Sequence, residues 1–121
     1  MKYMLLIYHD EHGWDGLTEA QRQDIYAEYG RLSQQLAEKG QLVDGSELQP
    51  ITTATSVRIR DGKELITDGP FAETHEQLGG YYLINVNNLD EATSIAAQIP
   101  SARTGTVEIR PLAEMAADAT A

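Results

Sequence analysis

In two stretches of the sequence, the odd-numbered and the even-numbered positions are both apolar. This pattern limits the folds that the chain can adopt. Residues 3–8 read YMLLIY, without a charged side chain. In residues 80–86, Tyr82, Ile84 and Val86 alternate with Tyr81 and Leu83. A strand that is apolar on both sides is typical of a sheet interior. We therefore expect two central strands in a sheet that is covered on both faces.

A helix is predicted after the first central strand. Thr18 and Gln21 have the spacing of a capping box, in which each side chain accepts a hydrogen bond from the other residue's backbone N–H. Lys39 and Gly40 supply a cation and a C-cap glycine at the far end. The apolar stripe of this helix is Ile25, Tyr29, Leu32 and Leu36, and its polar face is Arg22, Glu28, Gln35 and Glu38.

A second helix and a last strand follow the second central strand. Asn88 and Glu91 have cap spacing, and Pro100 marks the end of this helix. Its apolar stripe is Ala92, Ile95, Ala96 and Ile99. Residues 105–110 then alternate apolar and polar side chains up to Pro111, which predicts a strand with Val107 and Ile109 facing inward.

The middle of the chain predicts a strand and a hairpin. Residues 41–48 form the strand, with a bulge or bend at Asp44-Gly45. Residues 57–60 and 63–66 then flank Asp61-Gly62, a pair that suits the positive φ angles of a tight hairpin turn. The hairpin is an addition to the main sheet, with one polar face.

The order of these elements predicts an α+β fold, a ferredoxin-like split β-α-β with an inserted β-hairpin. We place this domain at residues 1–112 and expect the alanine-rich residues 113–121 to form a frayed tail. Two helices cover only one face of such a sheet. The second face is therefore expected to pack against the same face of another copy, as a homodimer that forms a dimeric α+β barrel.

The composition excludes several classes of partner. The 121 residues carry 19 acids against 9 bases, a formal net charge of −10, so the surface repels phosphate backbones and anionic lipid. We expect neither nucleic acid nor a membrane as a partner. The chain has no cysteine and its N-terminal apolar run is too short for a signal peptide, which favours a cytoplasmic location.

The loop after the hairpin is the predicted functional site, because it gathers titratable groups between two apolar runs. Asp68 and His75 are the candidate catalytic acid–base groups, since histidine titrates near neutral pH and mutual repulsion could raise a carboxylate pKa. Arg58 and Glu73 are the candidate substrate-binding residues, with Arg58 as a clamp for an anionic group. The structural alternative is an Asx-turn at Asp68, with Phe71 in the core and the glutamates in water.

Other catalytic or binding motifs are weak in this sequence. His9-Asp10-Glu11-His12 places two imidazoles beside two carboxylates, but such an acidic tetrapeptide in a loop is more often solvated than metal-bound. No serine lies in a Gly-x-Ser-x-Gly motif, and no glycine-rich phosphate loop follows a strand. We therefore predict no metal site and no organic cofactor. The tyrosines of the first helix and second central strand are interpreted as core aromatics, with room for one hydroxyl to face a pocket.

The loop also carries a resemblance to a known family. It reads Asp68-Gly69-Pro70-Phe71-Ala72-Glu73-Thr74-His75-Glu76-Gln77-Leu78-Gly79-Gly80. This stretch resembles the signature of the DGPF branch of the YCII-related proteins, and residues 1–8, 47–50, 55–58, 79–82 and 108–111 extend the similarity. The resemblance implies a dimeric ferredoxin-like barrel. Two positions depart from the family: His75 replaces the usual lysine, and residues 18–39 lack the histidine that YCII-type relatives pair with an aspartate.

Two classes of function stay open at this point. The first is an enzyme that uses no cofactor and applies acid–base chemistry to a small anionic molecule. The resemblance of the expected fold to dimeric barrels that isomerise, dechlorinate or oxygenate small carbonyl compounds favours this class. The second is a non-catalytic ligand-binding or regulatory accessory domain. Some similar proteins accompany alternative sigma factors, which implies a protein partner in transcription regulation.

Overall fold

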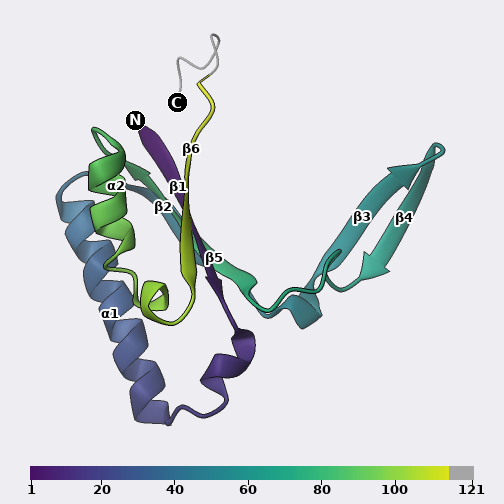
Figure 1. Cartoon of the computed structure of the whole chain (residues 1–121), viewed down its shortest axis with the longest axis horizontal. Coiled ribbons are helices and arrows are strands. Elements are labelled where there is room, and N and C mark those ends of the chain that lie inside the picture. Colours follow the sequence, from purple (N-terminus) through teal and green to yellow (C-terminus); the bar gives the residue numbers. More distant parts are fainter. Residues whose placement is uncertain (115–121) are drawn as a thin grey trace.

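The computed structural model describes residues 1–114 and has the predicted α+β, ferredoxin-like architecture (Figure 1). Its four-stranded sheet has the order β2-β5-β1-β6, and all neighbouring strands are antiparallel. The helices α1 and α2 cover one face of this sheet. The main elements are β1 (Lys2–His9), α1 (Glu19–Glu38), β2 (Leu42–Glu47), β3 (Thr55–Arg60), β4 (Lys63–Asp68), β5 (Gln77–Asn85), α2 (Leu89–Ala96) and β6 (Thr106–Pro111).

The core lies between the sheet and the two helices. Alternate residues of β1 point into it, so that Tyr3, Leu5 and Ile7 are buried. The intervening Met4, Leu6 and Tyr8 are only half-buried, because no element of the described chain covers the outer face of the sheet. The remaining core residues come from α1, β5, α2 and the segment after it: Leu32, Leu36, Tyr82, Ile84, Val86, Ala92, Ile95, Ala96 and Ile99.

The predicted capping residues are confirmed at both helices. The Gln21 backbone N–H donates to Thr18 Oγ1 at 3.1 Å, and the Thr18 N–H donates to Gln21 Oε1 at 2.8 Å. Asn88 Oδ1 accepts from the Glu91 N–H at 2.9 Å. The predicted end of α2 is wrong by one turn: the α-helix stops at Ala96, and Pro100 instead begins a short 3₁₀ helix, Pro100–Arg103, a position that its missing N–H suits.

The hairpin of β3 and β4, here called the arm (residues 55–68), stands away from the rest of the fold (Figure 1). The predicted turn is confirmed, since Asp61 and Gly62 have φ angles of 52° and 74°. Along the arm, Val57, Ile59 and Ile66 are 56–64% exposed. The two ends of the arm meet at its base, where the Gly69 N–H donates to the Ala54 carbonyl oxygen at 2.6 Å.

Two sequence predictions concern the chain ends and the membrane. The frayed tail was assigned to residues 113–121, and residues 115–121 lie outside the described part of the chain. Neither helix within residues 1–114 has the length and apolar character needed to cross a membrane.

Candidate functional site

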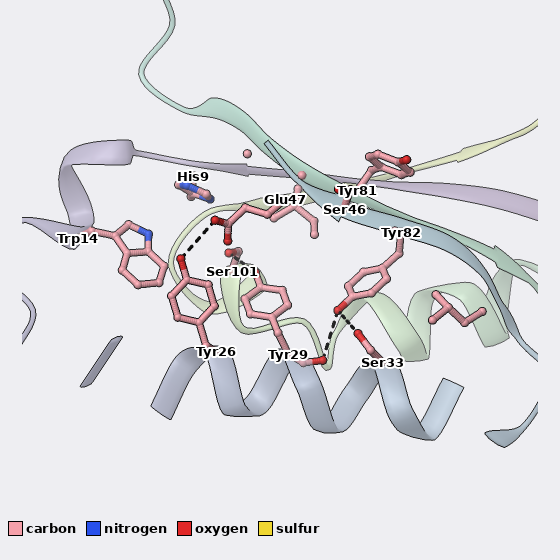
Figure 2. Close-up of a pocket in the computed structure, with 15 residues that line it drawn as sticks. His9, Trp14, Tyr26, Tyr29, Ser33, Ser46, Glu47, Tyr81, Tyr82 and Ser101 are labelled. Carbon is pink, nitrogen blue, oxygen red and sulfur yellow. Dashed lines mark hydrogen bonds between the residues drawn. The ribbon is translucent and has the colours of Figure 1, made fainter. Parts of the chain in front are cut away.

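A cavity of about 570 Å³ opens between α1 and the inner face of the sheet (Figure 2). This volume suits a small molecule. Aromatic rings and hydroxyl groups form much of its wall, and a 3₁₀ turn after β1, η1 (Glu11–Trp14), contributes at one end. The lining residues are Ile7, His9, Trp14, Tyr26, Tyr29, Ser33, Leu42, Gly45, Ser46, Glu47, Gly79, Gly80, Tyr81, Tyr82 and Ser101.

His9, the last residue of β1, is placed in this cavity by an irregularity in the sheet. The pairing of β1 with β5 runs from Ile7 opposite Gly80 to Tyr8 opposite Leu78, so Gly79 is an extra, unpaired residue. A Cβ atom built on Gly79 would lie 2.3 Å from Cε1 of His9. The imidazole therefore lies directly against a backbone that only glycine leaves accessible.

The mouth of the cavity combines titratable and aromatic groups. Nδ1 of His9 is buried and has no hydrogen-bond partner. Glu47 lines the cavity as His9 does, and the Tyr26 hydroxyl donates to Glu47 Oε1 at 3.3 Å (Figure 2). The ring of Tyr26 lies 5.5 Å from that of Trp14. Burial, and secondarily the Glu47 carboxylate, raise the pKa of Tyr26, so its hydroxyl stays protonated at neutral pH.

The deep end of the cavity carries two hydroxyl pairs. Tyr29 and Ser101 share a hydrogen bond of 2.6 Å, and Tyr82 and Ser33 share one of 2.9 Å. Burial raises the pKa of both tyrosines above the ordinary value of about 10. These groups are neutral at physiological pH and can orient an oxygen atom of a ligand by hydrogen bonding.

A second cleft of about 440 Å³ adjoins the mouth and adds a cation to the site. Arg22 lines it, together with Glu11, Glu19 and five residues shared with the cavity wall: His9, Trp14, Tyr26, Glu47 and Gly79. Arg22 Nη2 donates to the Trp14 carbonyl oxygen at 2.7 Å. Arg22 belongs to the polar face that the sequence predicts for α1, but it is not fully exposed to solvent. The side chain is half-buried because η1 folds back beside the first turns of the helix.

Comparison with known sequences identifies the family of this fold. The profile of the YCII-related domain matches residues 1–116. The chain belongs to the YCII-related family. An uncharacterised protein of Rhizobium meliloti (strain 1021) is 36% identical over 115 residues, which cover 93% of each chain. The more specific assignment to the DGPF branch stays a prediction.

The predicted site residues of this YCII-related domain lie outside the cavity. Asp68 ends β4 opposite Thr55, and Arg58 lies opposite Leu65 in the arm. Glu73 and His75 lie in the loop between the arm and β5. All four residues are exposed, and none lines either the cavity or the cleft. Their predicted roles are untested, and a single chain does not bring them together around a pocket.

The structural alternative for the loop places the Phe71 side chain in the core. Phe71 is 77% exposed, so its predicted place in the core is wrong for a single chain. Its aromatic side chain instead faces solvent on the segment that follows the arm.

The histidines of the tetrapeptide at residues 9–12 separate in the structure. His9 enters the cavity, whereas His12 is exposed and its Nδ1 lies 3.3 Å from Asp15 Oδ2. Asp10 Oδ1 accepts a hydrogen bond from the His12 N–H. No three His, Asp or Glu side chains within residues 1–114 converge in a way that could hold a metal ion.

Sequence reasoning missed the residues that build the cavity. His9 was considered only as a metal ligand, and Arg22, Glu47 and Trp14 were given no functional role. The available signal was a histidine at the end of a buried strand in a chain that also has a Gly79-Gly80 pair at the start of the neighbouring strand. Two adjacent glycines in a strand often mark the close approach of another group.

Proposed function

We propose that this YCII-related protein is a cofactor-free enzyme that applies acid–base chemistry to a small molecule bound in the cavity, with His9 as the proton-transferring group. The single observation that carries the proposal is the imidazole of His9, which lines a cavity walled largely by aromatic rings and is held against Gly79. Imidazole can accept a proton at one ring nitrogen and release one again, so His9 can act as both general base and general acid.

The surrounding hydroxyl groups support a reaction at a carbon next to a carbonyl group. In this scheme His9 removes the proton from that carbon, and the electron pair moves onto the carbonyl oxygen. The Tyr29 hydroxyl, kept protonated by its raised pKa, is suited to donate a hydrogen bond to such an oxygen while it accepts from Ser101. The Tyr82 hydroxyl instead donates to the Tyr29 carbonyl oxygen at 3.5 Å. His9 then returns the proton to the same or a neighbouring atom, which restores the enzyme.

The proposal is tested by hydrogen–deuterium exchange of phenylacetone in D₂O, followed by proton NMR. Phenylacetone is neutral, carries one aromatic ring and has an exchangeable C–H between ring and carbonyl. The three histidines of the chain provide matched variants, since His9 lines the cavity, His12 faces solvent and His75 lies in the predicted loop site. We expect protein-catalysed exchange that His9→Gln lowers about 100-fold, within the range of general acid–base contributions.

Each variant has a distinct meaning in this test. His12→Gln should leave the exchange rate unchanged. If His75→Gln abolishes exchange and His9→Gln does not, the loop site predicted from sequence is the catalytic one. If the protein gives no exchange above buffer at any pH between 6 and 9, the enzyme proposal is rejected.

We also propose that the protein is a homodimer in the cytoplasm and that the second copy covers the outer face of the sheet. The half-buried Met4, Leu6 and Leu83 on that face support this, as do the exposed apolar side chains of the arm. In such a dimer, the exposed residues Asp68, His75, Arg58 and Glu73 of one chain could lie against the other chain and form part of a site.

One observation favours the alternative of a regulatory accessory domain. The arm and Phe71 together present exposed apolar side chains on a projecting element, a form suited to a protein partner. The histidine variants separate this alternative from the enzyme, because an accessory domain would show no His9-dependent exchange.

A further inference from the structure

Arg22 is a half-buried cation that has no carboxylate partner among residues 1–114, in a chain with 19 acids and 9 bases. The salt bridges formed within residues 1–114 are His12–Asp15 and Arg103–Glu28, and neither involves Arg22. Its Nη2 is bound to the Trp14 carbonyl oxygen, whereas Nε is buried and has no acceptor. Nη1 donates to no group within residues 1–114, and a guanidinium N–H in a cleft wall is a strong donor to an anionic oxygen.

The carboxylates that share the cleft with Arg22 are engaged elsewhere. Glu11 Oε1 accepts from the Ile51 N–H at 2.8 Å, and Glu47 Oε1 accepts from the Tyr26 hydroxyl at 3.3 Å. Glu19 Oε1 accepts from Gln23 Nε2 at 3.3 Å. Because three glutamates line the cleft together with Arg22, a dianion meets more like-charge repulsion there than a monoanion. The cleft therefore favours a single negative charge on its ligand.

The cleft is continuous with the aromatic cavity. His9, Trp14, Tyr26, Glu47 and Gly79 line both spaces. A ligand whose charged group reaches Arg22 would place its remaining atoms past His9, against the rings of Tyr29 and Tyr82 (Figure 2). Those walls are aromatic and apolar apart from their hydroxyl groups, so the body of the ligand should be apolar.

We infer that Arg22 is the anion-binding residue of this site and that the natural ligand is a small monocarboxylate with an apolar, ring-sized body. The inference rests on the proposed function, because it names the substrate class of the same cavity. The ligand carboxylate accepts from Nη1–H and from the second Nη2–H of Arg22, in the end-on bidentate geometry that guanidinium groups provide. The carbon that reacts then lies between Arg22 and the hydroxyl pairs, beside His9.

The inference is tested by the binding of phenylacetate and phenylacetamide, which have the same ring and differ in charge. Isothermal titration calorimetry on the full chain gives both dissociation constants. We expect phenylacetate to bind at least 10-fold more tightly than phenylacetamide, and Arg22→Gln to remove that preference without weakening phenylacetamide. Arg22→Lys should keep part of the preference, since it retains the charge but not the fork. Arg31→Gln, an exposed arginine on the same helix, is the control and should change neither constant.

A second measurement uses the unaltered protein, so its result cannot be affected by a variant that fails to fold. The Nε–H of Arg22 can be followed by nitrogen-15 NMR in the unaltered protein, and phenylacetate should slow its exchange with solvent and shift its resonance. Phenylmalonate, a dianion with the same ring, should bind at least 10-fold more weakly than phenylacetate.

The outcomes separate this inference from the proposed function. Equal binding of phenylacetate and phenylacetamide, no binding of either, or an unchanged Nε–H signal overturns the role of Arg22. Exchange of neutral phenylacetone would then still report on His9. Conversely, tight Arg22-dependent binding of phenylacetate with no His9-dependent exchange would support the anion site and reject the acid–base enzyme.

Discussion

The body of the domain and the arm are built from similar residues in opposite environments. Ile84 in β5 is fully buried among side chains from both helices, whereas Ile66 in β4 is 64% exposed. Both strands contain branched residues and both are paired, but β5 has neighbours on each side and a covered face, while β4 has one neighbour and no covered face. An isolated two-stranded hairpin is at best marginally stable in water. The comparison indicates that the arm needs a further surface to pack against if it is to be as stable as the body of the domain.

The Asp-Gly-Pro-Phe signature and the candidate site lie on opposite sides of this boundary between the arm and the body. The Asp-Gly-Pro-Phe stretch begins at the last residue of the arm, and every residue proposed from it for the site is exposed. The cavity with His9 and Arg22 belongs to the body. A sequence signature and a catalytic site can therefore lie in different parts of one small domain.

The largest expected effect comes from the same substitution in the two regions. Ile84→Ala should lower the free energy of unfolding by about 2–5 kcal/mol, because it leaves a cavity in the core. Ile66→Ala should cost less than about 0.5 kcal/mol if solvent surrounds the arm. Urea denaturation at low and high protein concentration measures both. A cost for Ile66→Ala that appears only at high concentration would place a second copy over the arm.

Removing the arm should have the next largest effect, on assembly rather than on folding. Since Ala54 and Gly69 are already hydrogen-bonded, residues 55–68 can be replaced by Asn-Gly without moving the ends. Sedimentation equilibrium should show a dimer dissociation constant raised at least 10-fold, equivalent to about 1.4 kcal/mol. The monomer should unfold at nearly the same urea concentration. An unchanged dimer would mean that the outer face of the sheet alone holds the two copies together.

A glycine substitution in the body should affect the site more than the fold. Gly79→Ala introduces a Cβ where the His9 ring lies, so the imidazole must move. We expect phenylacetone exchange to fall about 10-fold, an effect typical of a misplaced catalytic group. Gly30→Ala is the matched control in α1, where a Cβ meets open space, and should stabilise the protein by up to about 1 kcal/mol. Unchanged exchange in Gly79→Ala would argue against a role for the position of His9.

The smallest expected effect is a pH dependence at the start of α2. Hydrogen bonds from the Asn87 backbone N–H and then from its side chain lower the pKa of the Glu91 carboxyl. Because the unfolded value is about 4.3, this carboxylate stabilises the fold above that pH, and the contribution is lost as the pH falls through the folded-state pKa. Acid titration of stability should be shallower for Glu91→Gln than for the unaltered protein. Asp90→Asn should not change the slope in the same way.

The fold was largely predictable because its determinants are local. The capping pairs at Thr18 and Asn88, the turn at Asp61-Gly62 and the double-sided apolar strands each act within a few residues. The end of α2 was misplaced because the apolar period continues to Ile99, which is buried although it is not in the α-helix. The periodicity of burial and the hydrogen-bonding pattern of the helix end at different residues.

The candidate site was not predictable in the same way, because it joins residues that are distant in the chain. His9 meets Gly79 through a register shift between β1 and β5, and Tyr26 meets Glu47 across the space between α1 and β2. Arg22 has the spacing of a solvent-facing residue, and only the return of η1 over the start of α1 buries it. The loop residues were chosen because they are close in sequence, which the formation of a pocket does not require.

The contact between the His9 ring and Gly79 links two positions that are 70 residues apart, and this has a consequence for divergence among relatives. Any lineage that acquires a side chain at position 79 must move, shrink or lose the ring at position 9, because both cannot occupy the same space. The two positions should therefore change together while the loop motif drifts independently. Relatives with a histidine at position 9 and a glycine at position 79 are those in which the proposed role of His9 can be tested.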